Sequence, residues 1–445
     1  MPLRFGRVLL ANVSRTLLWA LLAQALLSIT RLITSMTVGG RFGSGSEIEL
    51  GYYSSAFSVL MILVALFEAF VTTPLTVFNQ RPTENRNRFN GHMLLAALMF
   101  AGVATAIVAI GILVIGRLSV VPEPLVSVLV VVACVAPLQL LREFARRWLL
   151  ANLRARFAAW MEVFFAALFI VGVIGLIAAD QVTAVYTFAL LGAVNLLGLI
   201  GLWRLLGSRF QIKRNGLADQ VLENARYGRW VAGENICSTL TMYFCNWYLL
   251  LRVDEAAAGV FFACFTVVLL ANPFLLGVSS ILAPRSAAAF HKGGNTALRS
   301  VLFRFGGLIV VVLSLFSVVL WFFGEPLTEL FFGPQYRDYF AKHLGGVNRV
   351  TGVLGLAMPV LGISYVAAYG LLAIRRPQHN FLAALAGLLV LLAIATSVPE
   401  PDLMVAAVAF LASFMAAMLL RVGLLAWSLR RKTGETNSGL IQDKS

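Results

Sequence analysis

The segment Thr16–Val38 reads TLLWALLAQALLSITRLITSMTV and decides the class of fold. Crossing the hydrocarbon core of a bilayer takes roughly 20 mostly apolar residues, and this segment is long enough. A cleavable secretory signal has a shorter apolar stretch that ends at a small-residue cleavage site, so we interpret the segment as a retained span. Its one charged residue is Arg31. The segment predicts a membrane helix with a cationic position in its outer half.

Comparable apolar segments recur along all 445 residues of the chain. Hydrophobic residues make up 60% of the sequence and charged residues 12%, whereas a soluble domain has about 25% charged residues. We therefore predict an all-α polytopic membrane protein with about twelve transmembrane helices. The predicted spans are 16–38, 51–77, 92–116, 122–141, 157–179, 182–206, 228–251, 257–283, 301–323, 351–374, 380–397 and 403–428.

The basic residues gather in alternate connections between these spans. Most of the 35 Lys and Arg residues fall on the side of the N-terminus, for example in 142–156 and 204–229. Because short cytoplasmic loops are enriched in Lys and Arg, we expect both termini in the cytoplasm. The net charge of +15 then indicates topology and contact with anionic lipid headgroups. No basic patch interleaved with aromatic residues is present, so we expect no nucleic-acid partner.

Two spans have polar stripes at the same helical spacing, which predicts an internal duplication. Each residue of the second stripe lies 210 positions after its counterpart, as Pro284 does after Pro74. The first stripe comprises Gln24, Ser28, Arg31 and Ser35, and the second comprises Glu234, Ser238, Thr241 and Cys245. We predict two six-helix halves around a central cavity, related as a parallel repeat. The expected boundaries are 1–206, a basic cytoplasmic linker 207–227, 228–432, and a disordered cytoplasmic tail 433–445.

Ionisable side chains inside spans are costly and are therefore candidates for function. We expect Arg31 to line a substrate-binding cavity together with Gln24, Ser28 and Ser35, because its helix face is polar over three turns. A structural ion pair with Glu68, or an arginine that reaches the outer headgroups, is the alternative. Glu68 itself is interpreted either as a proton relay or as the charge that balances Arg31.

In the seventh span, Glu234, Ser238 and Thr241 are the corresponding cavity candidates. We interpret Glu162 as a carboxylate that reaches the cytoplasmic headgroups. Arg421 is interpreted as a topology anchor near a cytoplasmic helix end. Both interpretations treat these charges as having no role inside the bundle.

Several classes of function are excluded by what the sequence lacks. The four cysteines and four histidines share no ligand spacing, so we expect no metal site. There is no GxxxxGK[ST] phosphate-binding loop, and no large extramembrane segment that would house an enzyme site. We expect no cofactor and no enzymatic activity.

The chain has a basic N-terminal lead, a first span with a polar face and a loop that ends in Gly51-Tyr52-Tyr53. In these features it resembles the polysaccharide flippases of the multidrug/oligosaccharidyl-lipid/polysaccharide exporter superfamily. The segment FGEPLTELFFGPQY at Phe323–Tyr336 is similar to that family's pattern L-x-x-L-[FL]-F-G-x-x-[YF]. The twelve-span plan agrees, so the resemblance covers essentially the whole chain.

The resemblance implies alternating-access export of a lipid-pyrophosphate-linked glycan, or a related polysaccharide precursor, across the bacterial inner membrane. The implied partners are membrane lipids, the lipid-linked glycan, and components of a polysaccharide synthase or polymerase. In the related lipid II flippases, arginines on the first, second and eighth spans hold the pyrophosphate. Arg31 has the matching first-span position, whereas the second span offers Glu68 and Arg285 lies at the inner end of the eighth.

Two alternatives stay open, and the sequence argues against a third. A cation-coupled multidrug antiporter of the same superfamily would use Glu68 and Glu234, and Arg31 would oppose a cationic cargo. A membrane scaffold of a polysaccharide synthase would transport nothing. A major-facilitator symporter shares the 6+6 plan, but 79–91 lacks that family's Gly-x-x-x-Asp-Arg pattern.

Overall fold

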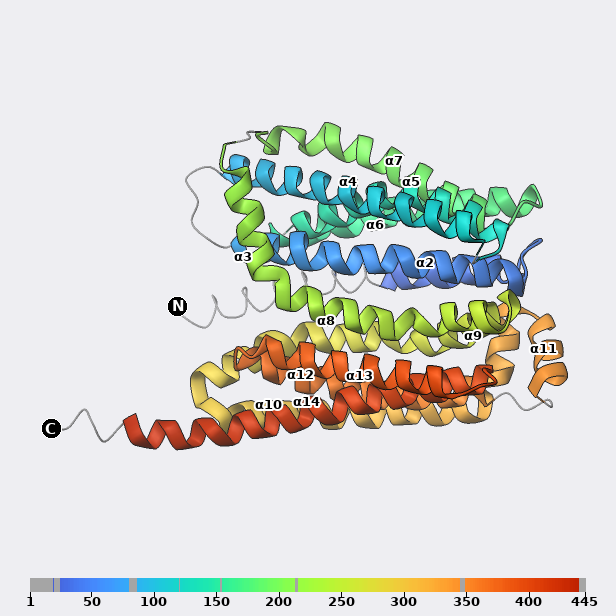
Figure 1. The fold of residues 1–445 in the computed structure, drawn as a ribbon. Coiled ribbons are helices and arrows are strands. Elements are labelled where there is room, and N and C mark those ends of the chain that lie inside the picture. The colour runs from blue at the N-terminus through green and yellow to red at the C-terminus, as the bar shows by residue number, and fades with distance from the viewer. Residues whose placement is uncertain are drawn as a thin grey trace. The chain divides into compact units, whose positions relative to one another are not determined.

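The structure is a computed structural model that describes residues 19, 25–79, 86–119, 121–152, 154–212, 215–344 and 349–439. Every regular element in this part of the chain is a helix (Figure 1). Nine helical segments there are long and apolar enough to cross a membrane, and one of them, Glu255–Phe332, covers two predicted spans. The shorter helix Ala25–Val38 lies within the first predicted span, and α8 (Leu217–Arg252) contains the seventh. The predicted all-α polytopic class, with its two halves, is confirmed.

The helices keep the order of the predicted spans. After Ala25–Val38, the first part of the chain contains α2 (Glu47–Phe67), the π-helical turn η1 (Glu68–Thr72), α3 (Thr73–Phe78), α4 (Arg86–Leu118), α5 (Glu123–Ala151), α6 (Ala155–Ala178), α7 (Ala184–Leu206) and η2 (Gly207–Arg209). The second part contains α8 (Leu217–Arg252), α9 (Glu255–Val268), η3 (Leu269–Ala271), α10 (Asn272–Phe332), α11 (Gln335–Leu344), α12 (Val350–Ala373), α13 (Pro377–Ser397) and α14 (Leu403–Gly439).

The chain divides into two compact units. The N-terminal unit comprises Met1–Ile236, Asp254–Ala263 and Phe331–Gly333, and the C-terminal unit comprises Cys237–Val253, Cys264–Leu330 and Pro334–Ser445. Within the N-terminal unit, α5 packs against α2, α4, α6 and α7, which makes it the central helix. Within the C-terminal unit, α14 packs against both α12 and α13. Side chains on α5 are therefore placed to meet partners from several helices.

The second span does not end at its proline. Pro74 cannot donate a backbone hydrogen bond, which would break a regular α-helix. The chain passes this point through the π-helical turn Glu68–Thr72 and continues as α3 to Phe78. Single π-helical turns of this kind are often found at functional sites, and this one presents the carboxylate of Glu68.

Two glycine contacts shape the path of the chain. A Cβ atom at Gly51 would lie 2.1 Å from the carbonyl oxygen of Glu255, and one at Gly259 would lie 1.8 Å from that of Glu47. Glycine at both positions thus lets α2 and α9 approach backbone to backbone. In α10, Gly293 and Gly294 leave helical geometry, and Gly294 has a φ of 59°. This kink separates the eighth predicted span from the ninth.

Candidate functional site

A cavity of about 70 Å³ lies inside the N-terminal unit, and we call it the N-terminal pocket. This volume accommodates a few water molecules or one small polar group. Its ionisable and amide-bearing lining residues are Arg31, Arg142, Glu162 and Gln139. Most of the remaining lining is apolar or aromatic, and it comprises Leu27, Thr30, Thr34, Tyr53, Phe57, Leu60, Met61, Phe165, Ala166, Phe169, Thr187, Phe188, Leu191 and Val194. The pocket is therefore a mainly apolar cavity with a few charged groups.

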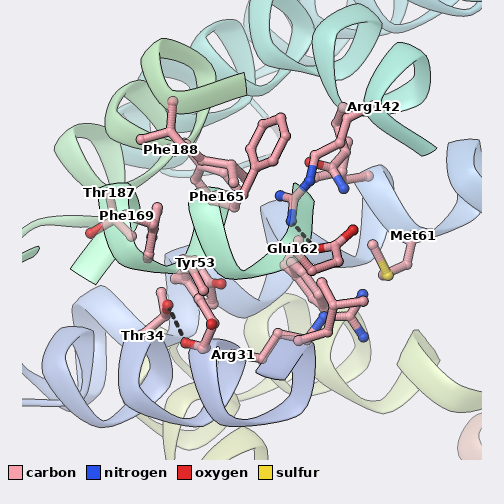
Figure 2. A pocket seen from close by; sticks show the side chains of 18 residues that line it. Arg31, Thr34, Tyr53, Met61, Arg142, Glu162, Phe165, Phe169, Thr187 and Phe188 are labelled. Atoms are coloured by element: carbon pink, nitrogen blue, oxygen red, sulfur yellow. Dashed lines mark hydrogen bonds and ion pairs between the residues drawn. The ribbon is translucent and has the colours of Figure 1, made fainter. Parts of the chain in front are cut away.

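Arg142 and Glu162 form a buried ion pair at this pocket (Figure 2). The Nη2 atom of Arg142 donates to Oε2 of Glu162 at 2.5 Å, and the side chain of Glu162 is 1% exposed. The Arg142 guanidinium also lies over the ring of Phe165, with Cζ 4.2 Å from the ring centroid. Glu162 thus does not reach the headgroups, and the sequence-based interpretation of this residue was wrong. It was wrong because Arg142 supplies a counter-charge within the bundle.

Amide side chains extend this pair towards α7. Nη1 of Arg142 donates to Oδ1 of the fully buried Asn195 at 3.3 Å, and Nδ2 of Asn195 donates to Oε1 of Gln139 at 2.9 Å. The other carboxylate oxygen of Glu162, Oε1, is buried and has no hydrogen-bond partner among the described residues. The pocket therefore presents one carboxylate oxygen whose hydrogen-bonding capacity is unused.

Arg31 contributes a second guanidinium to the same pocket (Figure 2). It lies on Ala25–Val38, is exposed, and its Cζ atom is 5.7 Å from the centroid of the Phe57 ring, a distance at which a cation and an aromatic face attract. It forms no ion pair with a described residue. Because Glu162 is neutralised by Arg142, the lining has one positive charge in excess, and Arg31 supplies it.

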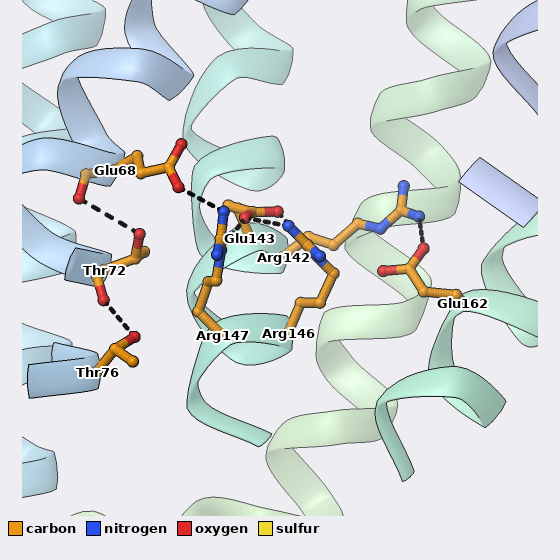
Figure 3. Close-up of polar contacts among 8 residues, drawn as sticks. All are labelled: Glu68, Thr72, Thr76, Arg142, Glu143, Arg146, Arg147 and Glu162. Atoms are coloured by element: carbon orange, nitrogen blue, oxygen red, sulfur yellow. Dashed lines mark hydrogen bonds and ion pairs between the residues drawn. The ribbon is translucent and has the colours of Figure 1, made fainter. Parts of the chain in front are cut away.

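A second set of ionic contacts, which we call the α5 charge cluster, comprises Glu68, Glu143, Arg146 and Arg147 (Figure 3). Glu143 accepts hydrogen bonds from both arginines: Arg146 Nε at 2.8 Å and Arg147 Nε at 2.9 Å. Arg147 also binds the carboxylate of Glu68 at 2.5 Å, with side chains that are 33% and 37% exposed. Glu68 therefore pairs with Arg147 and not with Arg31, and it does not line the N-terminal pocket.

The other predicted site residues are distributed as follows. Gln24 lies outside the described residues. Ser28 is half-buried and Ser35 is buried, but neither lines the N-terminal pocket, to which their helix contributes Leu27, Thr30, Arg31 and Thr34. Of the first-span stripe as described, Arg31 alone therefore lines the pocket.

The seventh-span stripe lies on α8. Glu234 and Ser238 are half-buried, whereas Thr241 is buried and its hydroxyl donates to the carbonyl oxygen of Cys237 at 2.9 Å. The role of this stripe stays a prediction. No group of three or more His, Cys, Asp or Glu within the described ranges is placed to hold a metal ion.

The sequence reasoning missed Arg142, Gln139 and Asn195. It ended the fourth span at residue 141 and assigned the following arginines to a cytoplasmic connection, whereas α5 runs on to Ala151. The segment LREFARRWLLA at Leu141–Ala151 has charges at i, i+4 spacing and returns to apolar residues at Trp148. That pattern is typical of a helix with one polar face and was the signal for the longer α5.

No protein-family model matches the sequence, and no curated protein matches it either. Solved structures do share its fold. One is the inward-facing conformation of a multidrug resistance MATE family transporter of the MOP superfamily, with a TM-score of 0.74, 13% identity, and coverage of 94% of this chain and 99% of that chain. The outward-facing conformation of such a transporter has a TM-score of 0.68 at 13% identity, and the alignment covers 94% of this chain and 96% of that chain.

A further similar structure is a MOP superfamily transporter from Pyrococcus furiosus Vc1 (DSM3638), described as having a binding pocket of reverse polarity that suggests a different function. Its TM-score is 0.72 at 14% identity, and the alignment covers 94% of this chain and 95% of that one. At these identities the likeness establishes the fold but does not identify a cargo. The chain has the fold of MATE-type transporters of the MOP superfamily.

Proposed function

We propose that this protein is an alternating-access exporter of an anionic cargo, and that the cargo is a lipid-pyrophosphate-linked glycan or a related polysaccharide precursor. The observation that supports the proposal is the excess cation of the N-terminal pocket. Arg31 lines it without an acidic partner among the described residues, while Arg142 and Glu162 neutralise each other. The fold is compatible with transport. The choice of a glycan as the cargo rests on the sequence resemblance.

The chemistry of the pocket favours an anion over a cation. A guanidinium has five N–H donors that match phosphate oxygens in a bidentate arrangement. Most of the surrounding side chains are aromatic or aliphatic, and the lower local dielectric of such a lining strengthens the attraction between opposite charges. The cavity of about 70 Å³ is small, so we infer that it receives part of a charged headgroup and that the sugar and lipid parts of the cargo lie elsewhere.

The test is transbilayer movement of a polyprenyl-pyrophosphate-linked sugar by the purified full-length chain in proteoliposomes. We expect Arg31→Ala to lower the initial rate by roughly 10- to 100-fold, because a hydrogen bond to a charged group contributes about 1.5–3 kcal/mol. Arg31→Lys keeps the charge but loses the planar donor pair, so its rate should lie between those of the wild-type protein and Arg31→Ala. Movement by purified protein alone would also exclude a pure scaffold role.

Arg41→Ala is the matched control, since Arg41 is exposed and follows the same helix without lining the pocket. It should transport at the wild-type rate. An Arg31→Ala protein with an unchanged unfolding temperature and an unchanged rate would refute the anion-binding role.

A cation-coupled multidrug antiporter is the second candidate. The unpartnered Oε1 of Glu162 favours it, because a carboxylate oxygen in the pocket is where a proton or cation would bind. Under this reading Glu162, and not Glu68, is the residue to test. Proton-driven efflux of a cationic dye that is lost in Glu162→Gln, with no movement of the pyrophosphate-linked sugar, would decide for the antiporter.

A further inference from the structure

The C-terminal unit has a larger cavity of a different kind, of about 550 Å³, which we call the C-terminal groove. It lies between the second segment of α10, α12 and α14. Its polar end comprises Asn295, Thr296, Arg299 and Arg430, and its apolar part comprises Leu302, Phe303, Gly306, Gly307, Val310, Ile363, Val366, Ala367, Val422, Leu425, Ala426 and Leu429. Two arginines and no carboxylate are thus among its lining residues.

The groove lies on a helix whose surface suits contact with lipid. Large apolar side chains of α10 are exposed, among them Phe303 at 74% and Val311 at 68%. Along α10, the distance from Arg299 to Val310 is about 16 Å at 1.5 Å per residue, close to half of the roughly 30 Å hydrocarbon core. An apolar chain that starts at Arg299 and follows the groove therefore spans about one leaflet.

Glycine opens the groove and a hydrogen bond holds its polar end. A Cβ atom at Gly307 would meet nothing within 4 Å, so the missing side chain leaves real space in the groove. Nδ2 of Asn295 donates to the carbonyl oxygen of Leu429 at 2.8 Å, which ties the start of the α10 segment to α14. Arg299 and Arg430 come from these two helices and are both exposed. The charged end is thus built from two connected helices.

The N-terminal unit has an apolar groove at the same ordinal helices of its own half. It lies between α4, α5 and α7, measures about 430 Å³, and has one cation in its lining, Arg204. A groove between the third, fourth and sixth helices thus occurs in each half, but the C-terminal one has two arginines. This difference selects the C-terminal groove as the stronger anion site.

We propose that the C-terminal groove binds an anionic phospholipid of the surrounding membrane, with an acyl chain along α10 and the headgroup phosphate between Arg299 and Arg430. Guanidinium groups bind phosphate through paired N–H donors. The aliphatic lining and its one-leaflet length match the acyl chain of such a lipid. The two cations at one end match its headgroup phosphate. This site is separate from the N-terminal pocket and does not depend on the cargo proposed above.

The test is native mass spectrometry of the purified full-length chain with phosphatidylglycerol and with phosphatidylcholine of identical acyl chains. We expect tighter binding of phosphatidylglycerol. Arg299→Gln and Arg430→Gln should each weaken it about fivefold, since a basic residue near anionic lipid contributes about 1 kcal/mol. Gly307→Leu should abolish binding of the tightest lipid while leaving the charges in place.

Two variants serve as matched controls. Gly423 on α14 is also an open glycine and Arg304 on α10 is also an exposed arginine, but neither lines the groove. Gly423→Leu and Arg304→Gln should bind as wild type. Leucine also favours helix over glycine, so Gly307→Leu is expected to fold.

Several results would overturn the proposal. Equal binding of the two lipids, or unchanged binding in Gly307→Leu, would show that the groove does not hold a lipid selected by charge. Displacement of the lipid by glycerol 3-phosphate would show that the site binds the phosphate group and does not require an acyl chain. A dimer that disappears in Gly307→Leu would place a second copy of this chain in the groove.

Discussion

The two units use charged residues inside their helices in different ways. In the N-terminal unit, three arginines of α5 are each paired with a glutamate, two of them through the α5 charge cluster and Arg142 through Glu162. In the C-terminal unit, the buried Arg421 donates from Nη1 to the hydroxyl of Ser364 at 2.9 Å, and the C-terminal groove has a mostly apolar lining with two arginines. The arginines of α5 are thus held by carboxylates of the N-terminal unit, whereas the buried Arg421 of the C-terminal unit contacts a hydroxyl.

The difference shows what a charge inside a helix bundle requires. An unpaired buried carboxylate or guanidinium is very costly, so partners must be built into neighbouring helices. In the N-terminal unit that requirement is met by charge pairs, and Arg31 is then the excess cation of the pocket. In the C-terminal unit the hydroxyl of Ser364 is one of the partners of Arg421, and the arginines of the groove lie at its polar end. Breaking one partner in each unit therefore tests the comparison.

The largest effect is expected from Glu162→Ala. This change leaves the guanidinium of Arg142 buried without its counter-charge, which typically costs about 3–5 kcal/mol. Thermal unfolding of the purified protein should show a large decrease in Tm. The double variant Arg142→Met/Glu162→Met should recover most of the loss, because two well-packed apolar residues need no counter-charge.

Glu68→Gln is the control for Glu162→Ala within the same unit. Its pair with Arg147 is about one third exposed, so we expect a loss of about 0.5–1 kcal/mol. If Glu68→Gln destabilised the protein as much as Glu162→Ala, burial would not distinguish the two ion pairs.

An effect between those of Glu162→Ala and Glu68→Gln is expected in the C-terminal unit from Ser364→Ala. This variant removes one hydrogen bond to a buried arginine, which contributes about 1.5–3 kcal/mol. The same unfolding measurement should place its loss below that of Glu162→Ala. A loss equal to that of Glu162→Ala would mean that the hydroxyl of Ser364 matters as much as a carboxylate, and the contrast between the units would fail.

The fold could be predicted from the sequence because apolar segments of spanning length are a strong signal. The ends of the helices were harder to predict, since charges near the end of a span indicate either a loop or a polar helix face. Because of this ambiguity, the sequence-based prediction located Arg142 outside the membrane and Glu162 at the headgroups. The pairing of Glu68 with Arg147, 79 residues apart, depends on how α5 packs against the turn at Glu68, and no local pattern contains that information.

The candidate site was predicted in part. Arg31 was found from the sequence because a lone arginine in an apolar span is rare. Its neighbours in the pocket were not found, because Phe165, Gln139 and Asn195 resemble ordinary core residues until α5, α6 and α7 are packed together. Likewise Arg421, interpreted as a topology anchor, is buried with Ser364 as a partner.

The most direct test of the central claim is whether transport depends on the charge of the cargo. Proteoliposomes with the purified chain should be given two sugars on the same polyprenyl chain, one joined through pyrophosphate and one through a neutral ether. We predict rapid movement of the pyrophosphate-linked sugar, little movement of the neutral one, and loss of this preference in Arg31→Ala. Equal rates for both cargoes in the wild-type protein, or a preference that persists in Arg31→Ala, would contradict the account.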